Sequence, residues 1–275
     1  MGISGSKFVE CVGQTSNEEQ GLGPQSEEGG ERDEIGEKGD IHDSEGPAAK
    51  KCNFHSLPPE VRTRIFKMVL SYSCNFVLKS VIRRQRRKVI REPREPGRRP
   101  CKIDVDLLKV DRQTAIEASA IFYRENFFIL EDTIALHHFL AAIGSANAAH
   151  LLKLRVESWG QTKTHKAFNF PAFTLLRSAT SLRLFSINSE ICRGNIGHIA
   201  RQFYQETYHY LDAVVAARNG DIDKAVRFIS ISKKNFENWE RRRLDDEEGI
   251  ERQKAFRKEL SALIQAEKVI HRPEE

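Results

Sequence analysis

A proline pair ahead of an apolar stripe is the feature that most constrains how this chain can fold. Pro58 and Pro59 suit the first turn of a helix, because a proline there loses no hydrogen bond that the helix would have made. Glu60 adds a negative charge to that turn, where the helix dipole favours it. Four apolar side chains then recur at helical spacing: Val61, Ile65, Met68 and Val69. We therefore expect a short amphipathic helix up to Leu70, with Leu57 folded back onto its stripe.

A second helix is predicted further along the chain. Asp106 is a good N-cap candidate, and Ala115, Ala118 and Phe122 share one face of the helix that would follow. The small alanines on that face would let the first helix approach closely. The apolar run at 127–130 then predicts a buried strand.

These two segments carry a recognisable pattern. Residues 57–66 read Leu-Pro-Pro-Glu-Val-Arg-x-x-Ile-Phe, and residues 107–118 read Leu-Leu-Lys-Val-x-Arg-Gln-x-x-x-Glu-Ala. Residues 122–128 continue with Phe-Tyr-x-Glu-Asn-x-Phe. In this order the blocks resemble the F-box-like proteins that are numerous in filamentous fungi. Two features differ from the usual motif: Leu70 and Leu107 are separated by a strand and a long basic loop, and Asp111 stands where the family usually has a small residue.

The resemblance implies an adaptor role. F-box proteins present their first helices to the Skp-type subunit of a cullin ubiquitin ligase, and the rest of the chain binds a protein substrate. By position, the implied contacts with that subunit are Leu57, Pro58, Val61, Ile65 and Phe66. A fungal interaction domain with no ubiquitin link, which would bury Leu57 and Ile65, is the alternative.

The rest of the chain predicts alternating strands and helices. The expected strands are 75–82, 151–157 and 182–187, and the expected helices are 132–143, one starting at Pro171, 196–219 and 235–269. Gly144 should end the first of these helices, and Gly249 is a candidate break in the last. The segment 226–231 suits either a strand or a helix end. A strand, a helix and a strand with connections of this length predict a parallel βαβ unit.

The predicted fold class is therefore α+β, an F-box-like helical pair with a small mixed sheet containing the βαβ unit. We expect an F-box-like domain over 53–190 and a helical C-terminal region over 191–275 that packs on it. Residues 1–50 are expected to form a disordered acidic tail, because 17–45 hold eleven acidic residues against Arg32 and Lys38.

The first residues match a lipidation pattern. Gly2 follows Met1, and Ser6 stands at the position that N-myristoylation requires. One myristoyl chain binds membranes only marginally, so a second signal such as palmitoylated Cys11 would be needed. Acylation would add peripheral membrane association to an otherwise cytoplasmic or nuclear protein.

Residues 83–100 are expected to form a basic loop. They contain nine basic residues, two acids and three prolines. The densest cluster is Arg83, Arg84, Arg86, Arg87 and Lys88. A solvated insertion, a nuclear import signal and a phosphate-binding segment of a nucleic-acid-associated protein all fit this composition. No aromatic residues are interleaved, so a stacking platform for single strands is not suggested.

Motifs for catalysis are missing from the sequence. It has neither a phosphate-binding Gly-x-x-x-x-Gly-Lys-Ser/Thr loop nor a Gly-x-Ser-x-Gly elbow. His137 and His138 are adjacent and would diverge on a helix, so they make a poor chelating pair. The five cysteines are scattered and odd in number, which favours reduced thiols in an intracellular protein. We expect no enzymatic activity, no cofactor and no metal.

Overall fold

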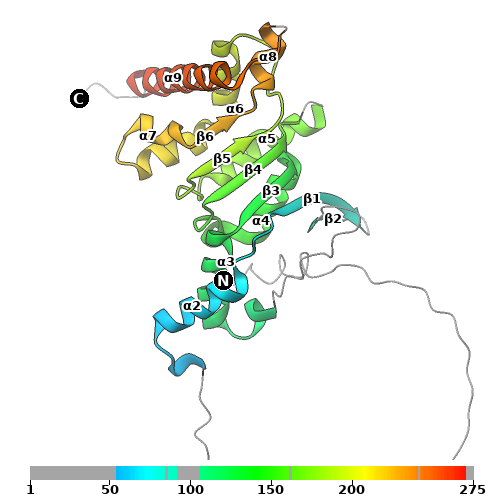
Figure 1. Cartoon of the computed structure of the whole chain (residues 1–275), viewed down its shortest axis with the longest axis vertical. Helices are drawn as coiled ribbons and strands as arrows, with labels where there is room; N and C mark the ends of the chain where they lie inside the picture. Colours follow the sequence, from blue (N-terminus) through cyan, green and yellow to red (C-terminus); the bar gives the residue numbers. More distant parts are fainter. Residues whose placement is uncertain (1–53, 84–85, 92–105, 161–162, 241, 271–275) are drawn as a thin grey trace, which may run out of the picture.

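The computed structural model describes residues 54–83, 86–91, 106–160, 163–240 and 242–270 (Figure 1). Its first half contains η1 (Phe54–Ser56), α2 (Pro59–Leu70), β1 (Phe76–Arg83), β2 (Arg86–Arg91), η2 (Asp106–Lys109), α3 (Arg112–Glu125), β3 (Phe127–Asp132) and α4 (Thr133–Ala148). The second half contains β4 (Lys153–Ser158), α5 (Lys163–Leu176), β5 (Leu184–Ile187), α6 (Ile196–Ala217), α7 (Ile222–Arg227), β6 (Ile229–Ile231), α8 (Lys234–Glu240) and α9 (Asp246–Ile270). The predicted α+β class is confirmed.

The strands form one mixed sheet in the order β2-β1-β3-β4-β5-β6. The β1–β2 pair is antiparallel and every other neighbouring pair is parallel. Val156 of β4 lies opposite Leu130 of β3 and Ile187 of β5, so apolar side chains align across the strands. The predicted βαβ unit is confirmed as β4, α5 and β5.

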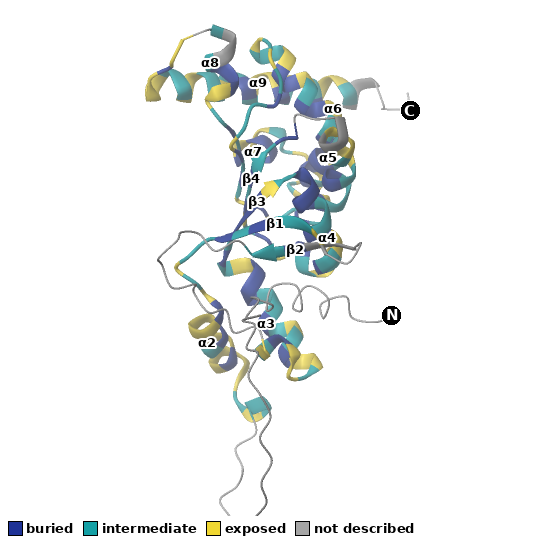
Figure 2. Ribbon diagram, turned by 90° about the vertical axis from the view of Figure 1, so that its right-hand side faces the viewer, coloured by how far each residue is buried: buried dark blue, intermediate teal, exposed yellow. Residues whose placement is uncertain are grey.

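Helices α4, α5 and α6 cover one face of this sheet (Figures 1 and 2). Every second residue of a strand points to the same face of a sheet, and the residues that point to the covered face are apolar. They are Phe128, Leu130, Leu154, Val156, Phe185, Ile187, Ile229 and Ile231, all buried. This layer of aromatic and branched side chains is the core of the molecule.

The opposite face of the sheet is more polar. The Arg155 guanidinium lies 5.3 Å from the centre of the Phe127 ring, and its Nε donates to Ser186 Oγ at 3.1 Å. Asn188 Nδ2 donates to Glu157 at 2.6 Å on the same side. The charged side chains of Arg155 and Glu157 in β4 therefore lie on the face away from the helices.

The C-terminal region completes the sheet instead of only packing on it. β6 is its last strand, and two side chains of α9 form hydrogen bonds with backbone groups of that strand. Gln253 Oε1 accepts from the Ile231 amide at 3.0 Å, and Arg257 Nε donates to the Ile229 carbonyl at 3.0 Å. An edge strand satisfied in this way is less available for pairing with another chain.

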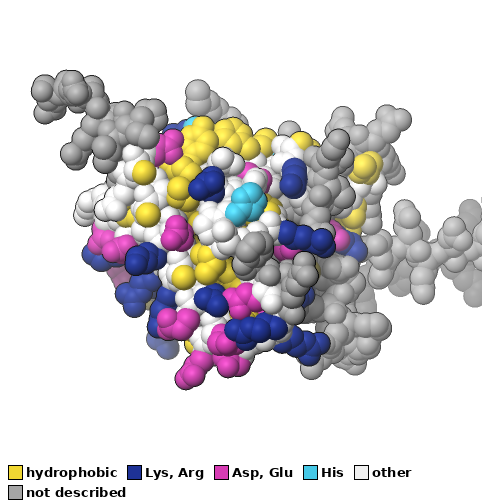
Figure 3. Space-filling view, turned by 90° about the horizontal axis from the view of Figure 1, so that it is seen from above, with side chains coloured by type: hydrophobic (Ala, Val, Ile, Leu, Met, Phe, Trp, Pro, Cys, Tyr) yellow, Lys and Arg dark blue, Asp and Glu magenta, His cyan; other side chains and the backbone are white. Residues whose placement is uncertain are grey.

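Charges of both signs are interspersed at the α8–α9 end of the molecule (Figure 3). Arg242 lies 2.7 Å from Glu248, and Arg252 lies 2.5 Å from Glu240. Such partly exposed pairs contribute little stability. Most of these charged side chains are partly exposed to solvent.

Several predicted boundaries need correction. Pro171 lies inside α5 and does not start it, because the helix begins eight residues earlier at Lys163. Gly249 lies inside α9, and the predicted break falls between α8 and α9. α4 continues past Gly144 to Ala148, but Gly144 has a non-helical backbone with a φ of 75° that suits glycine, so the regular helix ends where it was predicted to end. The segment 226–231 contains both a helix end and a strand.

The basic segment is also not a loop throughout. Arg86–Arg91 form strand β2, which pairs with β1 in the register Arg83 to Arg86 and Leu78 to Arg91. Burial of Val89 gives the strand an apolar anchor that the charge count obscured. The predicted tail at 1–50 and the loop residues 92–100 lie outside the described residues.

Candidate partner-docking surface

Helix α2 starts as the proline pair predicts. Pro58 is the N-cap, and its carbonyl accepts from the amides of Val61 and Arg62 at 3.0 and 3.1 Å. Pro59 is the first helical residue, where its missing N–H costs no hydrogen bond. The chain therefore enters α2 through a rigid turn from η1.

The two sides of α2 have different surroundings. Its core side is formed by Arg62, Phe66 and Leu70, which are buried and four residues apart. The apolar stripe points outward: Val61 is 43% exposed, Met68 71% and Val69 45%, while Ile65 is half-buried. We call these four side chains, Val61, Ile65, Met68 and Val69, the α2 stripe. An exposed apolar stripe on an ordered helix is a feature of partner-binding surfaces.

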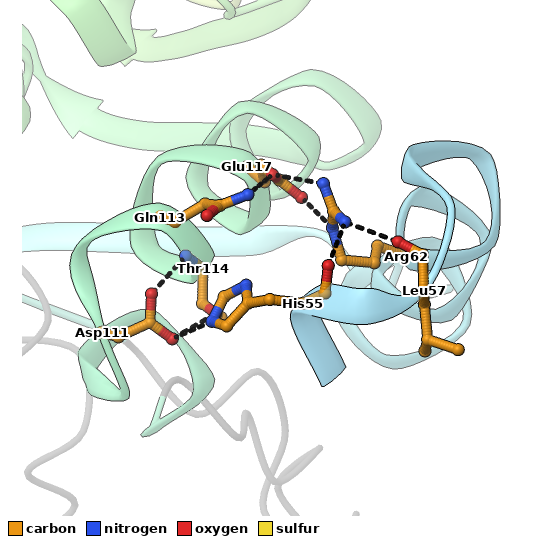
Figure 4. A network of polar contacts seen from close by, with 7 residues as sticks. All are labelled: His55, Leu57, Arg62, Asp111, Gln113, Thr114 and Glu117. Atoms are coloured by element: carbon orange, nitrogen blue, oxygen red, sulfur yellow. Dashed lines mark hydrogen bonds and ion pairs between the residues drawn. The ribbon is translucent and has the colours of Figure 1, made fainter. Parts of the chain in front are cut away.

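The buried Arg62 is held by a bidentate ion pair with α3 (Figure 4). Its Nε and Nη2 each donate to Glu117 at 2.9 Å, and Nη1 donates to the carbonyls of Leu57 and His55 at 2.6 and 3.3 Å. Gln113 Nε2 also donates to Glu117 at 2.9 Å. The hydrogen bonds from Arg62 and Gln113 lower the pKa of Glu117, so it is ionised and paired near neutral pH. This ion pair fixes the turn before α2 and the start of α2 against α3.

Asp111 has a structural role as the N-cap of α3. Its carboxylate accepts from the Thr114 amide at 2.9 Å and from the Thr114 hydroxyl at 2.6 Å. His55 Nε2 lies 3.1 Å from the same carboxylate. The Thr114 hydrogen bonds, with His55 nearby, lower the pKa of Asp111 to about 2. Asp106, the predicted N-cap, instead lies in the short helix η2.

Asn126 joins the other ends of the two helices. Its Nδ2 donates to the carbonyls of Leu70 and Phe122 at 2.7 and 2.8 Å, and its Oδ1 accepts from the Tyr72 amide at 2.9 Å. Because Arg62 meets Glu117 and Leu70 meets Asn126, α2 and α3 run in the same direction. Together η1, α2, η2 and α3 form what we call the α2–α3 lobe, which extends from one end of the sheet (Figures 1 and 2).

The predicted contact residues fall into two groups. Leu57, Val61 and Ile65 are half-buried or exposed, and Pro58 is exposed, so all four are accessible on the lobe. Phe66 is fully buried and lies 5.5 Å from the Phe54 ring, centre to centre. Its predicted partner contact is therefore corrected to a packing role, because a buried ring cannot reach another protein.

The remaining predicted sites are the lipidation residues and the basic cluster. Gly2, Cys11 and Arg84 lie outside the described residues. Arg83 ends β1, and Arg86, Arg87 and Lys88 belong to β2, so backbone pairing gathers them at one edge of the sheet. The lipidation pattern and the basic cluster remain separate predictions.

The structural roles of two lobe residues were not predicted from the sequence. Arg62 was read as part of the family motif, although its spacing of four from Phe66 and eight from Leu70 marks the buried face. Asp111 was read only as a departure from the family pattern, although aspartate is one of the residues that helix N-caps prefer. Both signals were present and local.

The adjacent histidines of α4 are packed beside an aromatic ring. The His137 and His138 rings lie 5.1 Å apart at 87°, and both contact Phe168. Burial lowers the pKa of His137, which favours a neutral, packed ring. Among the described residues, no three histidine, cysteine or carboxylate side chains gather as metal ligands would. None of the described helices is long and apolar enough to cross a membrane.

Comparisons with profiles of known protein families, with curated protein sequences and with solved structures found no match for this chain.

Proposed function

We propose that this chain is a protein–protein interaction adaptor that docks a partner through the α2 stripe. The observation that carries the proposal is the outward position of Val61, Met68 and Val69 on a helix whose other side is fixed by Arg62 and Phe66. A helix held in this way loses little conformational freedom on binding, so more of the contact energy is available for affinity. The side chains of Ile116 and Val110, 62% and 67% exposed, add apolar surface from the α3 side of the lobe.

The partner that we propose is a Skp-type subunit of a cullin ubiquitin ligase. Support comes from the F-box-like sequence blocks, since the first block contains both the proline turn and the α2 stripe. On this proposal the rest of the molecule binds a protein substrate. In this chain α2 and α3 run parallel and are separated by β1 and β2, whereas a compact F-box runs its helices together. The Skp-type subunit would therefore meet a different surface beside α2.

The test is capture of a purified Skp-type subunit by the full chain. Leu57→Ala combined with Pro58→Ala should abolish capture, because it removes an accessible apolar side chain and the rigid turn beside the stripe. Ile250→Ala is the matched control, since Ile250 is also apolar and 57% exposed but lies on α9. Equal thermal unfolding of the variants would show that the fold is intact. Failure of the unmodified chain to capture the subunit would overturn the ligase proposal and favour an interaction domain without a ubiquitin link.

A nucleic-acid partner is the second candidate, favoured by the register of the basic hairpin. Pairing of Arg83 with Arg86 and of Ile82 with Arg87 concentrates basic residues at the β2 edge of the sheet. Phosphate contacts release counterions, so binding to duplex DNA or RNA should weaken steeply with salt. Binding that is absent at about 50 mM salt, or that ignores salt, would exclude this candidate.

A further inference from the structure

Basic side chains gather where three neighbouring strands begin. Lys153 is the first residue of β4, Arg183 directly precedes β5, and Arg227 ends α7 two residues before β6. Phe185 of β5 lies opposite Ile229 of β6, and Arg183 and Arg227 each stand two residues before this pair. Because the three strands run parallel, their amino-terminal ends meet at one edge of the sheet. We call Lys153, Arg183 and Arg227 the amino-edge patch.

The charges of the amino-edge patch are not compensated within the described structure. All three side chains are exposed, and among the described residues no carboxylate forms an ion pair with them. The two acidic side chains of the α7 segment have other partners. Asp221 lies 2.9 Å from Lys224 Nζ, and Asp223 accepts from Ser261 Oγ at 3.2 Å. The patch is therefore an exposed positive surface that attracts anions.

Arg257 of α9 adds a fourth cation beside the patch. Its Nε donates to the Ile229 carbonyl at 3.0 Å, which holds the guanidinium at the edge of β6. Burial and the nearby charge of Arg227 lower the pKa of Arg257, so the two guanidinium groups are close enough to repel each other. An anion that contacted Arg227 would relieve this repulsion.

The same chain contains a segment of opposite charge. Residues 17–45 hold eleven acidic residues against two basic ones, whereas the rest of the chain holds 42 lysine and arginine residues against 28 acidic ones. Residues 46–53 connect this segment to Phe54. About 20 residues of extended chain span up to about 65 Å, more than twice the diameter of a small domain of about 30 Å. The acidic segment can therefore reach any side of the molecule.

We propose that the acidic segment 17–45 docks on the amino-edge patch of its own chain. A single exposed ion pair contributes little, but a tethered segment has an effective concentration of about millimolar and brings many carboxylates at once. The segment has few apolar residues, so the contact is electrostatic and reversible. The docked segment would cover the patch and keep other polyanions away from it. The patch lies on different elements from the α2–α3 lobe, so this contact is independent of the proposed adaptor function.

Cross-linking in the full chain tests where the segment docks. Arg183→Lys and Arg227→Lys keep the positive charge and supply amines that a carbodiimide joins to carboxylates. Mass spectrometry should find links from both positions and from Lys153 to residues 17–45. At about 0.5 M salt their yield should fall at least about fivefold from its value at about 50 mM, because salt screens exposed charges. Arg201→Lys is the matched control, since Arg201 is also exposed but lies near the start of α6, beyond the opposite ends of the strands.

Two cross-linking results would overturn the proposal. One is an equal yield of links to the segment from Arg201→Lys and from the patch variants. The other is links confined to the lysines of the basic region, Lys88 and Lys102, which would place the acidic segment there. Arg183→Glu combined with Arg227→Glu should also lower the yield from Lys153 at least about fivefold, whereas Arg201→Glu should not. Circular dichroism checks that each variant is folded.

A polyanion probe gives an independent readout. We expect amide substitutions in the acidic segment to tighten heparin binding at least about threefold, because they free the patch. The substituted residues are Glu27, Glu28, Glu31, Asp33, Glu34 and Glu37. Adding Arg183→Gln and Arg227→Gln should remove this gain. No gain, or a gain that survives the two arginine changes, would contradict docking on the patch. Heparin binding that needs the two arginines but ignores the acidic segment would assign the patch to an external polyanion instead.

Discussion

Asn126 illustrates how single polar residues hold the lobe together. A buried amide in this position would be costly without partners, but here both its donor and its acceptor are used. It satisfies the end of α2 and the end of α3 at once, in the place where a cap residue is needed. Arg62 does the same at the other end, with four hydrogen bonds from one guanidinium. The buried polar side chains of Asn126 and Arg62 therefore help to hold α2 against α3.

Asn126→Ala should destabilise the folded chain by about 3 kcal/mol, because it leaves the Leu70 and Phe122 carbonyls without this donor in a buried position. Urea unfolding measures the change. Thr174→Ala, which removes a hydroxyl bonded to a carbonyl on the exposed side of α5, is the control and should change stability far less. Equal effects of the two substitutions would contradict the role given to Asn126.

Asp111 predicts a pH dependence of stability. Its pKa is about 2 in the folded chain against an ordinary 3.8, so the carboxylate stabilises the fold when ionised. That contribution is complete above the unfolded pKa and disappears as pH falls through the folded pKa. Asp111→Ala should therefore lower the melting temperature at pH 7, and the gap to the unmodified chain should close between about pH 4 and pH 2. A gap that stays constant over this range would show that ionised Asp111 is not the cause.

At the scale of elements, α2 separates packing from proposed binding on one helix. Phe66→Ala removes a fully buried ring and should cost about 3 to 5 kcal/mol. Met68→Ala removes a side chain that is 71% exposed and should change stability by about 0.5 kcal/mol or less. Chemical denaturation compares the two. Comparable losses would mean that the stripe is buried in solution and is not a docking surface.

Elements whose signal is local were predictable from the sequence. β4 follows from the alternation of Leu154 and Val156 with charged neighbours, and α2 follows from its proline turn. The direction of the stripe was not predictable, because an apolar face can meet either the core or a partner, and only the ion pair of Arg62 with α3 decides it. Strand β2 was missed because its pairing with β1 and the burial of Val89 outweigh its charge. The start of α5 was predicted wrongly because Pro171 was taken as its first residue, although it lies inside the helix.

At the scale of the whole molecule, one sheet joins segments that are far apart in sequence. β1 and β6 lie almost 150 residues apart in the chain yet belong to the same sheet. The region after residue 190 supplies β6 and the helix that covers its edge. We therefore expect the described residues to unfold together.

Limited proteolysis should yield a resistant fragment of about 53–270. Early cleavage is expected at 1–50, because the acidic composition of that segment predicts a disordered tail. Mass spectrometry of the digest gives the boundaries. Early cleavage between Leu130 and Leu151 would instead indicate two independent domains.

The most direct test of the central claim is a quantitative titration of the full chain with the Skp-type subunit. We predict that Met68→Glu, which puts a charge in the middle of the α2 stripe, weakens binding at least about tenfold. Ile250→Glu, the same change at a 57% exposed position on α9, should leave the affinity unchanged. Equal affinities of the unmodified chain and the Met68→Glu variant, measured in folded protein, would contradict the claim that α2 docks this partner.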